Sequence, residues 1–214
     1  MKKITFFIFI VIWSNGLAQK GFKATSKLGA KIGVVSANMQ GGRVKSGSRI
    51  VFEGGIWCQI KLSKKWTGQA ELMYVEKGTD FTSKGSARSG DYAVSIMYIE
   101  CPILFQYHIK NFILEGGPGA GVLFFQKETL AGAPSPDLTN SYPFNKSELS
   151  FNIGCGYSLN NKWLLGLRFT HSVLPIRKQI PDIPKQVYSR VFAIAFSRNF
   201  TTGKEKKSEA SSIE

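Results

Sequence analysis

Long hydrophobic runs are scarce in this sequence. The longest hydrophobic segment, residues 4–13, is ten residues long, and no later run approaches the eighteen or more that a membrane-spanning helix needs. Apolar residues nevertheless make up 43% of the chain. Any part of the chain that crosses a membrane is therefore expected to do so with strands.

Cysteine and histidine are also rare, with three and two copies. The odd cysteine count and the lack of a C-x-x-C pair argue against a disulfide framework and against a zinc site. His108 and His171 belong to different predicted strands, and neither a zinc-protease helix motif nor a G-x-S-x-G elbow is present. We therefore expect no enzyme, no catalytic or metal-binding residues, and no cofactor.

A nucleotide loop is missing as well, although residues 113–125 (ILEGGPGAGVLFF) are rich in glycine. A phosphate-binding loop needs a Lys-Ser or Lys-Thr pair after its glycines and then a helix. Here Val122 takes the place of the third glycine of a dinucleotide fingerprint, and the residues that follow favour a strand. The glycines need another explanation.

The N-terminus has the features of a secretory signal peptide. Lys2 and Lys3 precede the apolar segment, and small residues, Gly16 and Ala18, precede Gln19. We expect cleavage after residue 18, a domain over residues 19–200, and a polar tail over 201–214. The net charge of +14 favours anionic partners, although nucleic acid is not expected for an exported protein.

Apolar and polar residues alternate along almost the whole remaining chain, which is typical of strands rather than helices. The alternation predicts eight strands, over residues 27–37, 50–62, 66–77, 92–107, 112–125, 149–159, 163–172 and 187–200.

The connections between these strands alternate in length. Those after the second, fourth and sixth strands are very short, and those after the first, third, fifth and seventh are long. Outer-membrane barrels place short turns on the periplasmic side and long loops outside. The fold class predicted is therefore all-β, an eight-stranded antiparallel up-and-down transmembrane β-barrel after a cleaved signal peptide, located in the outer membrane of a Gram-negative cell. Lys64, Asn111 and Asn161 are then periplasmic, and Arg43, Gly85 and Ser135 are external.

One face of the strands is large and apolar, and the other is small or polar. A soluble ligand-binding barrel would turn the apolar face inward. A face of Gly, Ser and Ala is instead suited to a narrow lumen, so we expect the apolar face to meet lipid. The glycines of residues 113–125 then save space inside the barrel. We also expect a bulge at Pro118, which has no N–H for the strand ladder.

The same alternation places six charged residues in the lumen. Because unpaired charges are costly there, we expect Lys31 and Arg168 to bridge four glutamates, with Gln59, Gln69, Tyr98 and Asn152 as hydrogen-bond partners. A plugged lumen is the leading interpretation, and a proton or ion pathway is the alternative. The lumen charge network is Lys31, Glu53, Glu71, Glu100, Glu115 and Arg168.

Residues 98–123 resemble the PorT-like outer-membrane β-barrel family of Bacteroidota. Tyr98, Glu100 and Pro102 match that family's aromatic-leucine-glutamate-x-proline strand, and the glycines around Pro118 match its Gly-rich segment. Residues 70–81 resemble its third strand. The resemblance implies the barrel fold and the outer membrane, and it suggests a role in type IX protein secretion. The tail after Phe200 departs from barrels that end at an aromatic residue, so an assembly signal would be internal.

The predicted function is that of an integral outer-membrane barrel with a plugged lumen, acting as a structural or interaction protein through its external loops. The alternatives are an accessory component of type IX secretion and a narrow porin or transporter. Expected partners are outer-membrane lipid and lipopolysaccharide, the outer-membrane assembly machinery during insertion, and secretion-complex proteins. The long loops carry eleven Lys or Arg against six Asp or Glu, and Arg43, Lys45 and Arg49 are candidate lipopolysaccharide contacts.

Overall fold

Eight strands make up the folded domain. The computed structural model describes residues 26–41, 47–81, 92–130, 143–160, 162–177 and 186–200. The predicted signal peptide, the polar tail, Arg43, Lys45, Gly85, Ser135 and Asn161 lie outside these ranges. The strands are β1 (Ser26–Gln40), β2 (Arg49–Lys61), β3 (Trp66–Phe81), β4 (Tyr92–Ile109), β5 (Phe112–Leu130), β6 (Ser147–Ser158), β7 (Trp163–Ser172) and β8 (Tyr188–Asn199).

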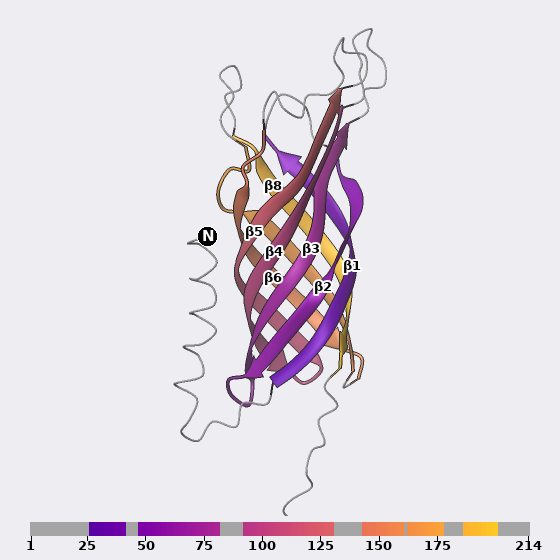
Figure 1. Ribbon diagram of the computed structural model, residues 1–214. Helices are drawn as coiled ribbons and strands as arrows, with labels where there is room; N and C mark the ends of the chain where they lie inside the picture. Colours follow the sequence, from indigo (N-terminus) through magenta and orange to yellow (C-terminus); the bar gives the residue numbers. More distant parts are fainter. Residues whose placement is uncertain are drawn as a thin grey trace, which may run out of the picture.

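The strands form a closed antiparallel barrel in sequence order. Each strand pairs with the next, and β1 pairs with β8 to close the sheet. The predicted eight-stranded antiparallel up-and-down barrel is confirmed. The short connections lie at the lower end of the barrel, and the strand ends that the long connections join lie at the upper end (Figure 1). No helix in the described ranges is long and apolar enough to span a membrane.

Side chains alternate between the outside and the inside of the barrel, as the sequence pattern predicts. Large apolar residues such as Ile32 and Phe52 are 67% and 64% exposed, while their neighbours Lys31 and Glu53 are 8% and 7% exposed. An apolar exterior and a polar interior suit a barrel that lies in lipid.

Glycine on the inner face makes room where strands and side chains come close together. A Cβ atom at Gly117 would lie 2.0 Å from the carbonyl oxygen of Ile103. At Gly29, a Cβ atom would lie 2.2 Å from the indole of Trp57, which fills the lumen beside it. The Gly-rich segment is therefore a space-saving part of the barrel wall.

The predicted bulge is present in β5 but not at Pro118. The register between β4 and β5 is the same on both sides of Pro118, and it shifts only where Met97 pairs with Phe125 and Tyr98 pairs with Leu123. Phe124 is the extra residue. Pro118 lies on the lipid face and pairs in regular register with Phe151 of β6. The strand therefore accommodates the missing backbone N–H of Pro118 without a bulge.

The barrel wall is uneven in height. Strands β3, β4 and β5 have 16, 18 and 19 residues, while β6, β7 and β8 have 12, 10 and 12. The longer strands rise above the rest of the barrel at the end with the long connections (Figure 1). Residues 78–81 and 126–130, which we expected in loops, are strand.

Candidate functional site in the barrel interior

A cluster of ion pairs crosses the lumen in the half of the barrel nearer the short turns. Lys31 of β1 donates through Nζ to both carboxylate oxygens of Glu71 of β3, at 3.0 and 2.9 Å. Arg168 of β7 donates to the same two oxygens at 2.6 and 2.9 Å. Two cations therefore hold one carboxylate, and three strands that are not paired with one another, β1, β3 and β7, are linked across the lumen.

Arg168 extends this cluster to β5. Its Nε and Nη2 lie 2.8 and 2.6 Å from Oε1 of Glu115. Gln106 of β4 donates to the other oxygen of Glu115 at 3.0 Å, and Gln69 donates to Glu71 at 2.7 Å. The carboxylates thus receive amide as well as charged hydrogen bonds, which reduces the cost of burying them.

Glu53 lies beside this cluster without joining it. It is on the inner face of β2, and its Oε1 is buried with no hydrogen-bond partner in the described part of the chain. The expected network therefore differs from the observed one: Lys31 and Arg168 bridge Glu71 and Glu115, but neither Glu53 nor Glu100.

A second cluster lies further toward the long loops, centred on Lys77. The Nζ of Lys77 lies 2.5 Å from Glu100 and 2.9 Å from Glu148, and 5.1 Å from the ring centroid of Tyr98. Lys77 is 1% exposed. We expected Lys77 and Glu148 among the external loop charges, and that expectation is wrong, because Lys77 lies within β3 and Glu148 within β6, and both side chains are buried in the lumen.

A third group of buried charges lies in the interior nearer the long connections. Arg177 forms a buried ion pair with Glu128, and its guanidinium lies 4.1 Å from the ring centroid of Phe144. Both charges were also expected in external loops; Glu128 is instead in β5, and Arg177 does lie in the connection after β7, but its side chain is buried. The extra residue Phe124 reverses the alternation along β5, so that Glu128 faces inward. Next to this pair is an apolar cluster of Met39, Val94, Ile96, Tyr98, Phe144 and Ile176.

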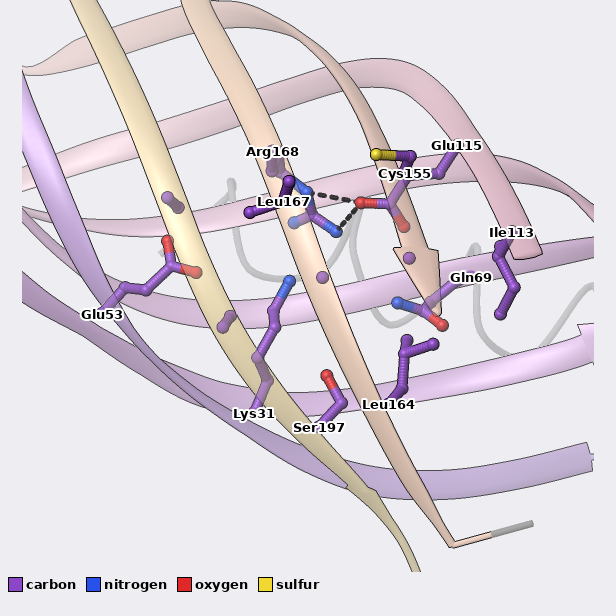
Figure 2. Close-up of a pocket in the computed structure, with 14 residues that line it drawn as sticks. Lys31, Glu53, Gln69, Ile113, Glu115, Cys155, Leu164, Leu167, Arg168 and Ser197 are labelled. Atoms are coloured by element: carbon purple, nitrogen blue, oxygen red, sulfur yellow. Dashed lines mark hydrogen bonds and ion pairs between the residues drawn. The ribbon is translucent and has the colours of Figure 1, made fainter. Parts of the chain in front are cut away.

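The space that remains inside is divided into small cavities. One of about 20 Å³ lies among Lys31, Glu53, Glu115 and Arg168 (Figure 2), and one of about 10 Å³ lies between Glu53 and the Lys77 cluster. A wider cavity of about 170 Å³ opens among the short turns. A single water molecule needs about 10–15 Å³, so the two inner cavities are water-sized.

The comparison with protein families agrees with this geometry. A family model described as "Outer membrane protein beta-barrel domain" matches residues 17–177, which is more than half of the chain. This chain belongs to that family. It is an outer-membrane β-barrel protein, and its apolar belt faces lipid. A comparison with curated proteins gives no significant match.

Solved structures of bacterial outer-membrane proteins are similar to this chain, and the one with the higher TM-score shares the fold. Ail, the attachment invasion locus protein of Yersinia pestis, in complex with the heparin analogue sucrose octasulfate, is 12% identical, with 82% of this chain and 99% of that chain covered and a TM-score of 0.50. Neisserial surface protein A is also 12% identical, with 84% and 100% covered and a TM-score of 0.45. Identity at this level shows the fold alone.

The histidines and cysteines of this outer-membrane barrel form no metal or disulfide site in the described ranges. In the described ranges no group of three or more His, Cys, Asp or Glu could hold a metal ion. His108 is 2.8 Å from the hydroxyl of Thr67, and His171 is 3.2 Å from the carbonyl of Ser189. The three cysteines are free, and Cys58 and Cys155 are exposed on the lipid face.

Of the candidate lipopolysaccharide contacts, only Arg49 is within the described ranges. Its guanidinium lies 3.5 Å from Glu76 and 3.7 Å from Asp80, so it already has acidic neighbours on β3. Without the buried Lys77, Arg177, Glu128 and Glu148, the expected loop charges are nine basic and four acidic residues. The basic excess is unchanged.

Proposed function

We propose that this protein is an integral outer-membrane barrel with a plugged lumen, which acts as a non-enzymatic structural or interaction protein through its external loops. The observation that carries this proposal is the set of buried ion pairs across the interior. An eight-stranded barrel is only wide enough for side chains. Here the side chains bond to one another from opposite walls, so an open pore would require breaking several buried ion pairs.

Conductance in planar lipid bilayers tests the plug. We expect the purified barrel to give no stable conductance, because the Lys31–Glu71–Arg168 cluster fills the lumen. A matched variant with both Glu71 and Arg168 replaced by Ser removes the cluster and keeps the net charge of the interior unchanged, and it should conduct at least briefly. Stable, ion-selective conductance of the wild-type barrel would instead favour the narrow porin.

The raised wall of β3, β4 and β5 supports an interaction role at the end with the long connections. A partner that binds there should co-purify from gently solubilised membranes. The test compares wild type with a variant in which a Gly-Ser turn replaces the connection between β5 and β6. Loss of the partner with an intact barrel supports the proposal, and equal recovery from both proteins contradicts it.

A second candidate function is an accessory role in type IX protein secretion. The resemblance of residues 70–81 and 98–123 to the PorT-like family of Bacteroidota supports it. A deletion strain should then lose secreted proteins that wild type exports, and the loss should be restored by the wild-type gene. An unchanged secreted-protein profile would remove this candidate.

Lipopolysaccharide is the proposed lipid partner, because basic loop residues can pair with its phosphates. Since Arg49 has acidic neighbours, Arg43 and Lys45 are the better test. Changing both to Ser should weaken lipopolysaccharide retention during purification, most at low salt, because high salt also screens the wild-type charges. Arg49→Ser serves as the comparison and should have the smaller effect. Equal retention by all variants at every salt concentration would contradict the proposal.

Export and insertion follow from the same proposal. The mature protein is expected to begin at Gln19, which N-terminal mass determination checks. The assembly machinery would recognise the closing strand β8 internally, with residues 201–214 as a polar tail. Truncation after Phe200 should therefore leave insertion unchanged.

A further inference from the structure

Glu53 differs from the other buried acids of the interior. It sits between the cluster of Lys31, Glu71 and Arg168 and the cluster of Lys77, and it lines both of the small cavities. Its Oε1 is buried without a hydrogen-bond partner, and Glu53 forms no ion pair in the described part of the chain. Figure 2 shows its carboxylate apart from the dashed contacts between Arg168 and Glu115.

The nearby cations are already engaged by other carboxylates. Lys31 and Arg168 together pair with Glu71 and Glu115, which balances that cluster without Glu53. Lys77 pairs with two carboxylates, so its cluster already has one negative charge in excess. The charged groups facing Glu53 from the surrounding strands are Lys31, Glu71, Lys77, Glu100, Glu115 and Arg168.

An ionised Glu53 would therefore be a buried charge without an ion-pair partner in the described part of the chain. Burial disfavours the charged form of a carboxyl group, and the neutral acid avoids the penalty. The protonated form also gains a donor that the carboxylate lacks. The charge balance of the interior thus favours a proton on Glu53.

A route for that proton leads from the end with the short turns. The wide cavity there shares Gln69 and Ser197 with the 20 Å³ cavity, which shares Glu53 and Arg168 with the 10 Å³ cavity. At the opposite end, the apolar cluster around Tyr98 and the Arg177–Glu128 pair separate Glu53 from the long loops. Access through polar, water-sized spaces is therefore from one side.

We propose that Glu53 is a proton-binding site inside the barrel, occupied at neutral pH and in exchange with water at the short-turn end. In the binding step, a hydronium ion or water molecule transfers a proton to a carboxylate oxygen of Glu53. An O–H bond forms on the carboxyl group, and water or hydroxide remains in the aqueous phase. This inference concerns the lumen and does not depend on any role of the external loops.

Infrared spectroscopy of the full-length barrel in lipid tests the proposal directly. At neutral pH, wild type should show the carbonyl band of a protonated carboxylic acid, which shifts in deuterated water. Glu53→Gln should lose the Glu53 component of that band. Glu71→Gln, the matched control, should retain it. An unchanged band in Glu53→Gln would overturn the proposal.

Stability against pH provides a second readout. If folding keeps a proton on Glu53 that the unfolded chain releases, the urea midpoint of wild type should fall relative to Glu53→Gln as pH rises. Glu71→Gln should lower the midpoint at every pH, because it weakens two ion pairs. If Glu53→Gln behaves like Glu71→Gln, then Glu53 is an ionised partner and the proposal is wrong.

Exchange kinetics test the route. Ser197→Leu narrows the link between the wide cavity and Glu53, and it should slow deuterium exchange of the Glu53 band several-fold. Met39→Ala at the opposite end should leave the rate unchanged. If Met39→Ala accelerates the deuterium exchange and Ser197→Leu has no effect on it, water reaches Glu53 from the end with the long connections. That result would overturn this part of the proposal.

Discussion

At the scale of single residues, stability in the barrel interior depends on matching each buried charge with a partner. Lys77 illustrates this, because it is 1% exposed and holds Glu100 and Glu148 on two other strands. Removing one member of a buried ion pair leaves the other charge uncompensated, and the cost is larger than the net contribution of the pair itself.

Lys77→Met is therefore expected to lower the free energy of unfolding by about 3–5 kcal/mol. Urea titration in lipid vesicles measures the effect. Arg190→Met, an exposed position on β8, is the control and should change the free energy of unfolding by less than about 1 kcal/mol. Equal stability of Lys77→Met and wild type would contradict the assigned ion pairs.

On the lipid face, a charged side chain is destabilising because it has no partner there. Leu167 of β7 is exposed on the apolar belt. Leu167→Arg should destabilise the inserted barrel by about 2–4 kcal/mol if the residue is near the bilayer midplane. The measurement is refolding into vesicles, with Leu167→Phe as the apolar control. An Arg variant as stable as the Phe variant would place Leu167 away from lipid.

At the scale of elements, one bulge decides which residues of β5 face the lumen. Phe124 is the extra residue, and beyond it the inward position passes to even-numbered residues such as Glu128. Alternation has a period of two, so a single added residue exchanges the two faces for the rest of the strand.

Deleting Phe124 and Phe125 together should remove the bulge, turn Glu128 toward lipid and leave Arg177 without its carboxylate, whereas deleting Phe124 alone, the matched control, should leave Glu128 facing the lumen. The expected cost is about 3–5 kcal/mol, as for a broken buried pair. Faster hydrogen exchange in residues 126–130 of the double-deletion variant, with residues 112–120 unchanged, is the predicted pattern. Protection equal to wild type along the whole strand would show that the bulge does not set the register.

At the scale of the whole molecule, the positions of the connections predict how the barrel lies in the membrane. Short turns occur at one end, and the strand ends that the long connections join are at the other (Figure 1). The family places the protein in the outer membrane, where short turns face the periplasm in barrels of this kind.

Epitope tags inserted at Ser135 and at Asn111 test this orientation on intact cells. The tag at Ser135 should bind antibody from outside, whereas the tag at Asn111 should be reached only after the outer membrane is permeabilised. Membrane fractionation confirms that both tagged proteins are inserted. Labelling of Asn111 alone on intact cells would invert the orientation.

The sequence by itself determined the fold class, the number of strands and the face of each residue in the middle of the barrel. Alternation is a local property with a period of two, and turn lengths alternate along the chain, so both can be read without a structure. The alternation alone places Lys31, Glu71 and Arg168 on the same face of the sheet as Glu53.

Only the tertiary structure decided how the charges pair and where the strands end. Partners such as Lys77 and Glu148 are separated by 71 positions in the chain, and their contact depends on register and closure around the barrel. The upper strand ends contain charged residues that resemble loop sequence, and they are strand because the lumen provides each charge with a partner. The position of the bulge was likewise decided by pairing between β4 and β5, since Pro118 on the lipid face is accommodated without a shift in register.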